Sequence, residues 1–93
     1  MKTYSLTVSS PDGILLAEPV QKLVLRGAEG DLAVMAGHVP LITTVKPCES
    51  AVTLEDGEEL VFHIEKGILS VYEQGKTTLI VEQTDLKKRK KRI

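Results

Sequence analysis

The stretch that decides the fold covers residues 52–64 and reads VTLEDGEELVFHI. Apolar and polar residues alternate on both sides of Asp56-Gly57. The apolar positions are Val52, Leu54, Leu60, Phe62 and Ile64. An Asp-Gly pair between two alternating runs is a strong hairpin signal, because the central residues of a tight hairpin turn adopt positive φ. The stretch therefore predicts two antiparallel strands that share one buried face.

The same two-residue period extends through most of the chain. The expected strands are residues 4–8, 14–17, 20–25, 32–35, 39–45, 51–55, 60–64, 68–72 and 77–82. No window of 11 residues shows the apolar spacing of an amphipathic helix. Short strands at roughly ten-residue spacing, separated by turn residues, indicate a β-sandwich or barrel. Two facing sheets suit the alternation, because each can bury its apolar face against the other.

Charge divides the chain into two parts. The net charge of −1 comes from 12 basic and 13 acidic residues. Six of the basic residues fill positions 87–92, so residues 1–86 carry −7 and the tail carries +6. At 93 residues the chain has room for one domain. We therefore expect a folded domain over residues 1–86 and a disordered basic tail over residues 87–93.

Signals for catalysis, metal binding and membrane insertion are weak. No apolar run approaches the roughly 18 residues of a membrane span, and the first residues lack the apolar core of a signal peptide. Cys48 has no second cysteine to pair with and is expected as a free thiol in a turn. One cysteine and two histidines, His38 and His63, form no cluster with metal-ligand spacing. No set of nucleophile, base and orienting residue can be assembled, so we expect neither enzyme activity nor a cofactor.

The basic tail admits several partners. Six cations can bind nucleic acid or anionic lipid by releasing counterions. The acidic body argues against nucleic acid, and so do the few aromatic residues, Tyr4, Phe62 and Tyr72, which are too few for base stacking. A solvated end or a local protein contact is the simpler interpretation.

Residues 27–44 read GAEGDLAVMAGHVPLITT. This stretch closely resembles the signature loop of the epsilon subunit of rotary (F-type) ATP synthases, which combines three glycines, two acids, a histidine and a proline at fixed spacing. Further matches follow in the same order through most of residues 1–86, among them Ser10-Pro11-Asp12-Gly13, the Asp56-Gly57 hairpin and residues 67–71. The resemblance implies a ten-stranded β-sandwich of two five-stranded sheets.

The resemblance also implies a mechanical function. The family's domain is a non-catalytic, peripheral part of the central stalk on the cytoplasmic face of the membrane, where it links the gamma subunit to the rotor ring of c subunits. It thereby helps to couple ion translocation to ATP synthesis. The implied ring contacts are Glu29 and Asp31, the implied gamma contacts are Ser10, His38 and Thr43, and the implied loop-shaping residues are Gly27, Gly30, Gly37 and Pro40. The simpler alternative is that the glycines serve backbone shape while the polar residues face water.

The chain departs from the family pattern at several positions. Ala36 replaces a usual proline, Ala33 a usual glycine and Cys48 a common glycine. The family's carboxy-terminal helical hairpin, which regulates ATP hydrolysis, has no counterpart after Glu82, so we expect a short form without this inhibitory element. The tail, Lys87–Arg92, stands in its place and could contact the acidic lower surface of the catalytic head or anionic lipid. A soluble β-sandwich adaptor that binds an acidic protein or anionic surface through this tail is the alternative function.

Overall fold

The computed structural model describes residues 2–72, 75–82 and 87–88, the last two by their backbone alone. The strands are β1 (Tyr4–Ser10), β2 (Gly13–Gly27), β3 (Gly30–Met35), β4 (Leu41–Val45), β5 (Cys48–Leu54), β6 (Glu59–Ile64), β7 (Gly67–Val71), β8 (Thr77–Val81) and β9 (Lys87–Lys88). Within these ranges the fold is all-β, as the sequence pattern predicts. The described residues include no helix of the length and apolar character needed to cross a bilayer.

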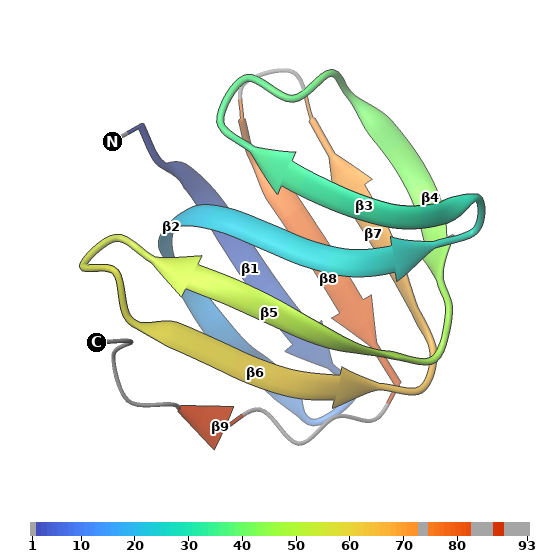
Figure 1. The fold of residues 1–93 in the computed structure, drawn as a ribbon. Helices are drawn as coiled ribbons and strands as arrows, with labels where there is room; N and C mark the ends of the chain where they lie inside the picture. Colours follow the sequence, from blue (N-terminus) through green and yellow to red (C-terminus); the bar gives the residue numbers. More distant parts are fainter. Residues whose placement is uncertain (1, 73–74, 83–86, 89–93) are drawn as a thin grey trace.

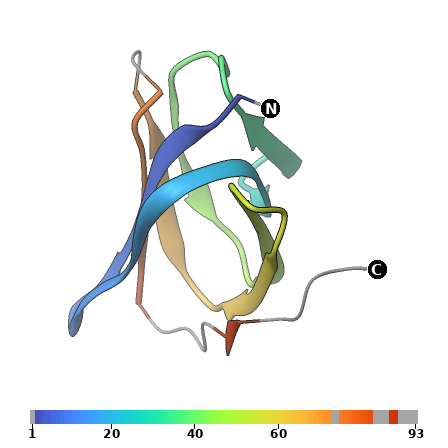
Figure 2. The same cartoon turned by 90° about the vertical axis from the view of Figure 1, so that its left-hand side faces the viewer.

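The strands form two layers that are joined by β2 (Figures 1 and 2). Layer one has the order β4-β7-β8-β1 and is completed by residues 13–20 of β2, which pair with β1. In layer two, residues 20–27 of β2 lie between β3 and β5, and β6 and β9 follow. Within the described residues, counting β2 once in each layer gives five strands a layer, which agrees with the sandwich implied by the family resemblance.

The long strand β2 is the main difference from the expected strands. The sequence predicts separate strands at 14–17 and 20–25, because Glu18-Pro19 interrupts the apolar pattern. The structure has one strand of 15 residues instead. Pro19 fits within it because the first half of β2 is an edge that pairs with β1 alone. Proline has no N–H to donate, and on an edge strand no second neighbour requires one. A register shift between Val20 and Lys22 marks the place where the strand passes from one layer to the other.

The core lies between the layers. Its largest fully buried side chains are Phe62, Leu6, Leu23, Ile64, Leu69 and Leu79. Tyr4 links the layers by a hydrogen bond, since its hydroxyl on β1 donates to the Val34 carbonyl on β3 at 2.8 Å. Burial raises the pKa of this phenol above its usual range, so the hydroxyl, protonated at neutral pH in any case, stays a donor in alkaline solution as well.

The expected hairpin around Asp56-Gly57 is confirmed. β5 and β6 pair from Cys48↔Ile64 to Thr53↔Glu59, and Gly57 adopts a φ of 91°. Cys48, by contrast, is not in a turn but begins β5, where its Sγ accepts a hydrogen bond from the Arg26 N–H at 3.4 Å. His63 is an exposed position on β6, as expected.

The expectation of a disordered tail is wrong for its first two residues. Lys87 and Lys88 form β9, which pairs antiparallel with Val61 and Leu60 of β6. This pairing is possible because β5 covers one side of β6, while the backbone N–H and C=O groups on the other side are available to β9. Residues 89–93 lie outside the described residues, so that part of the expectation stays a prediction.

Candidate interaction surfaces

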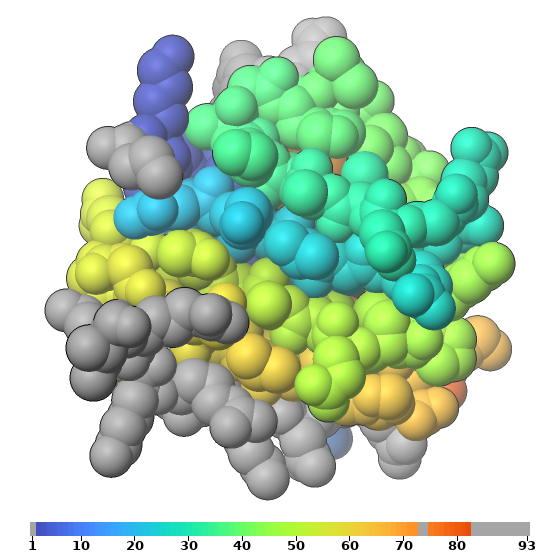
Figure 3. Space-filling view, in the orientation of Figure 1, coloured from blue at the N-terminus to red at the C-terminus, as the bar shows by residue number. Residues whose placement is uncertain are grey.

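The first candidate surface is the turn between β2 and β3. We call residues 26–31 the signature hairpin. Gly27 and Gly30 are its last paired residues, and Ala28 and Glu29 form the turn between them. Figure 3 shows the face of layer two, and the signature hairpin projects at its right-hand edge. The turn depends on Gly30, whose φ of 126° is unfavourable for any residue with a side chain.

Its two acids have different surroundings. The Arg26 Nε–H donates to the Asp31 Oδ1 at 3.0 Å, so the charge of Asp31 is balanced by its neighbour across the hairpin. Among the residues that the structure describes, Glu29 has no such ion pair and is exposed at the turn. The hairpin therefore presents the negative charge of Glu29 most directly.

Three contacts fix the signature hairpin to layer one. The Ala28 N–H donates to the Thr43 Oγ1 on β4 at 3.2 Å. The Lys46 N–H donates to the Arg26 carbonyl at 2.9 Å, and Gly27 pairs with Val45. Gly27 does not have a positive φ; a Cβ at this position would lie 3.4 Å from the Thr43 Oγ1. Thr43, implied as a gamma contact, thus also holds the signature hairpin through its hydrogen bond to Ala28.

The loop between β3 and β4 holds the next implied residues. Gly37 adopts a φ of 87°, which lies in the region that favours glycine. The His38 N–H donates to the Met35 carbonyl at 3.1 Å, and the ring Nδ1–H donates to the Val39 carbonyl at 2.6 Å. These bonds orient the half-buried imidazole and leave Nε2 without a partner in this loop. Pro40 is exposed immediately before β4.

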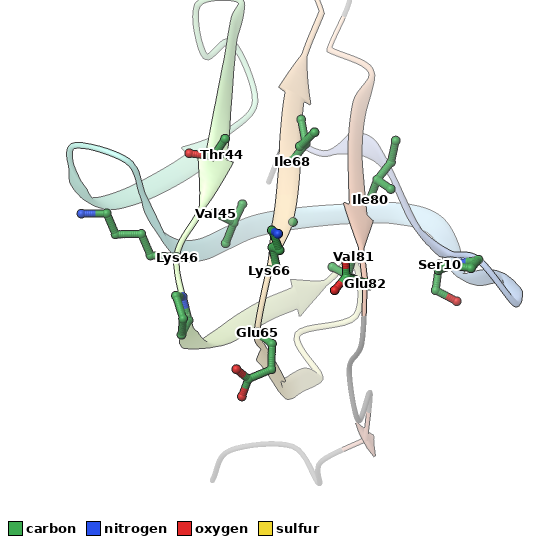
Figure 4. Close-up of a pocket in the computed structure, with 13 residues that line it drawn as sticks. Ser10, Thr44, Val45, Lys46, Glu65, Lys66, Ile68, Ile80, Val81 and Glu82 are labelled. Atoms are coloured by element: carbon green, nitrogen blue, oxygen red, sulfur yellow. The ribbon is translucent and has the colours of Figure 1, made fainter.

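The second candidate surface is a groove of about 760 Å³ on the outer face of layer one (Figure 4). Its floor is apolar: Ile68 on β7 lies directly opposite Ile80 on β8, and these side chains are 47% and 50% exposed. Gly67 extends the floor next to Ile68. Ser10 lies at one end, where its Oγ accepts a hydrogen bond from the Asp12 N–H at 3.2 Å. Ile42 on β4, 73% exposed, adds a third large apolar side chain to the same face.

The structure brings some of the implied residues together and separates others. Glu29, Asp31 and Thr43 line one hollow of about 500 Å³ beside the signature hairpin. Ser10 lines the apolar groove, and His38 lies in neither. Ser10 and His38 belong to opposite ends of layer one, because Ser10 ends β1 in the row of Gly67 and Val45, whereas His38 precedes the other end of β4. The three implied gamma contacts therefore do not form one cluster.

Sequence reasoning missed Ile68 and Ile80 as surface residues. Both occur in apolar runs, and a core position and an outward position look alike there until the strand register is known. Arg26 was also missed, although its place opposite Asp31 follows once the turn at Ala28-Glu29 is assigned. Among the described residues, no group of three His, Cys, Asp or Glu side chains could hold a metal ion.

Comparison with known proteins identifies the class. Residues 3–85 match the family described as ATP synthase, Delta/Epsilon chain, beta-sandwich domain. Because this match covers nearly the whole sequence, the chain belongs to that family.

Two solved structures contain similar chains. One is a chain of the Euglena gracilis mitochondrial ATP synthase (OSCP/F1/c-ring, rotational state 1), with a TM-score of 0.85 and 26% identity over 90% of this chain and 53% of that one. A second, in the central stalk/c-ring structure of the Tetrahymena thermophila mitochondrial ATP synthase, has a TM-score of 0.74 and 12% identity over 87% and 64% of the two chains, a likeness of fold alone. The present chain thus spans about half to two thirds of the length of these matches.

Proposed function

We propose that this chain is a non-catalytic central-stalk subunit of an ATP synthase that links the gamma subunit to the membrane rotor ring. It is thereby a peripheral component that helps to couple ion translocation to ATP synthesis. The observation that carries the proposal is the firm attachment of the signature hairpin to layer one in a domain of this family. An element that transmits torque must not bend at the point where it meets its partner. The bonds from Ala28 to Thr43 and from Lys46 to Arg26 provide that stiffness.

In this proposal the signature hairpin faces the ring. The resemblance implies polar and basic ring loops, to which an exposed acid is electrostatically complementary. Glu29 supplies that charge, because Arg26 already balances Asp31. Asp31 then acts mainly by holding the hairpin, and Glu29 makes the contact.

The gamma subunit covers the outer face of layer one. Exposed apolar side chains gathered on one face are typical of protein–protein interfaces, since water contact with them is unfavourable. Ile42, Ile68 and Ile80 form such a face. Ser10, implied as a gamma contact, lies at the end of the same groove. The two surfaces meet at β4, so a single rigid domain contacts both partners.

The substitution Glu29→Lys tests the ring contact. In a reconstituted complex we expect ATP hydrolysis to continue, while ion pumping per ATP hydrolysed falls about five- to tenfold at low salt, because a cation would then face basic loops. The measurement is hydrolysis and pumping on the same vesicles. Asp31→Asn should reduce pumping less, because it removes a charge that Arg26 already neutralises.

Glu18→Lys is the matched control, since Glu18 is an exposed acid on the first half of β2, in layer one. Equal pumping by the Glu29 and Glu18 variants would contradict a ring contact through the signature hairpin.

A further inference from the structure

β3 lies at the edge of layer two and connects two of the candidate contacts (Figure 1). It runs from Gly30 in the signature hairpin to Met35, which precedes the loop that holds His38. Its six residues span about 17 Å of extended chain. Within the described residues β3 pairs with β2 alone, so backbone pairing holds it on one side only. The distance between the implied ring contact and the His38 loop therefore depends on what else holds this strand.

Few side chains of β3 attach it to the core. Val34, 1% exposed, is its one fully buried residue, and Leu32 is half-buried. The other residues of the strand are exposed. Since apolar burial stabilises β3 little, polar contacts carry a larger share of its attachment to the rest of the domain.

At the hairpin end, this attachment is made to β4 of layer one. The Ala28 N–H donates to the Thr43 Oγ1 at 3.2 Å. The Thr43 hydroxyl donates its own proton to the Thr44 carbonyl at 3.1 Å, which leaves a lone pair of the oxygen for Ala28. The hydroxyl of Thr43 is thus fully used in holding the signature hairpin, and it has no proton left to offer a partner.

At the other end, Tyr4 of β1 makes the attachment to layer one. Its hydroxyl donates to the Val34 carbonyl at 2.8 Å, and the residue is 6% exposed. A backbone carbonyl has two lone pairs, so this bond can form beside the pairing of Val34 with Leu23 of β2. The next residue, Met35, accepts the His38 N–H at 3.1 Å. The Tyr4 bond therefore lies next to the loop that carries His38.

We propose that β3 is a brace between the ring contact and the His38 loop, and that Tyr4 is a positioning residue that holds the far end of this brace to layer one. The inference rests on the proposed function, in which Glu29 meets the ring and the gamma subunit binds layer one. A short edge strand with little burial opens as one unit, so loosening either end loosens the other. Two independent attachments would instead each affect their own end alone.

Reciprocal hydrogen exchange in the purified full-length chain tests the brace. Tyr4→Phe removes the bond at the far end, and Thr43→Val removes the bond at the hairpin end. We expect Tyr4→Phe to accelerate exchange of the His38 amide about five- to tenfold and of the Ala28 amide about threefold. Thr43→Val should show the reverse order, since coupling between two sites is reciprocal. Thr43→Ser keeps the hydroxyl and should return both rates to within about twofold of those in the unmodified chain.

Tyr72→Phe and Thr53→Val are the matched controls. Tyr72 is 52% exposed and Thr53 lies on β5, and neither hydroxyl has a hydrogen-bond partner among the described residues. Both controls should leave the two amides unchanged. The Gly57 amide, which donates to the Leu54 carbonyl at 3.0 Å, reports on the opposite edge of layer two and should not change in any variant.

Two results of the exchange experiment would overturn the brace. One is acceleration at the altered end alone in both variants. The other is equal acceleration of the Gly57 amide, because the substitutions would then lower the stability of the whole domain instead of releasing β3.

Ion pumping in the assembled complex tests what the brace does. The double variant Tyr4→Phe with Thr43→Val should lower pumping per ATP hydrolysed about threefold, because the signature hairpin is then held less firmly against its partner. Normal pumping by this variant, with a loss in Glu29→Lys, would overturn the brace and leave the ring contact intact. Normal pumping in Glu29→Lys would overturn the ring contact itself, whereas the exchange rates would still show whether the two ends of β3 are coupled.

Discussion

Replacing Ile68 and Ile80 together by aspartate is expected to abolish stable binding to the gamma subunit. The two side chains lie opposite each other on β7 and β8 at the floor of the groove and are about half exposed. Two carboxylates there remove apolar contact and place charge in a desolvated interface, which together costs about 3 kcal/mol or roughly 100-fold in Kd. Titration calorimetry with the purified gamma subunit measures this change.

The fold should tolerate the double substitution, because both side chains point away from the core. Met35→Asp is the matched control: Met35 is 53% exposed and lies on β3 in layer two. It should bind gamma as the unmodified chain does. A double variant that binds gamma within about threefold of the unmodified chain would show that gamma does not cover this face.

Gly67→Ala is expected to give the largest loss of stability among single substitutions in the groove. A Cβ at this position would lie 2.7 Å from the Ile80 carbonyl oxygen, closer than a carbon and an oxygen can pack. That oxygen belongs to the paired backbone of β8, so it cannot move aside as a flexible side chain would. We expect a cost of about 2–3 kcal/mol, which lowers Tm by about 10–20 °C in a domain of this size.

Gly27→Ala is the comparison. Its Cβ would meet the Thr43 Oγ1 at 3.4 Å, an ordinary van der Waals contact that needs no rearrangement. Differential scanning calorimetry of the two variants should therefore show a much larger shift for Gly67→Ala. Equal shifts would mean that the close approach of β7 to β8 relaxes without cost.

The sequence predicts the local pairing of this fold well. The Asp56-Gly57 pair specifies the hairpin, and the shared apolar face specifies its register, with Val52 opposite Leu60. The tight turn with positive φ at both central residues does not form, because Gly57 alone of the two adopts a positive φ. The path of β2 could not be predicted in the same way. Its first half has few buried side chains, so the alternation that marks a strand is lost while the chain passes between the layers.

The strand β9 in the tail could not be predicted from local sequence at all. Two lysines have no strand propensity of their own, and β9 forms because β6 offers an open edge. Because β6 is distant from the tail in sequence, the local pattern of residues 87–88 cannot predict this pairing. The split of charge between body and tail is visible in the sequence, but the register of β9 is needed to show that Lys87 and Lys88 lie beside the edge of β6.

The candidate surfaces were predictable in part. The signature hairpin and its acids follow from residues 27–31 by family resemblance, whereas the balance of Asp31 by Arg26 requires the pairing of β2 with β3. The apolar groove could not be predicted, since it depends on which residues of β7 and β8 face outward. Thr43 illustrates a further limit, because its hydrogen bond to Ala28 gives it a structural role besides any contact with gamma.

Site-specific photo-cross-linking in the assembled complex tests the central claim most directly. One probe replaces Ala28 in the signature hairpin, and a second replaces Ile42 on the outer face of layer one; both positions are exposed. The account predicts that the first probe captures c subunits of the ring and that the second captures the gamma subunit. If neither probe captures its partner while the chain is present in the complex, the chain does not link gamma to the ring.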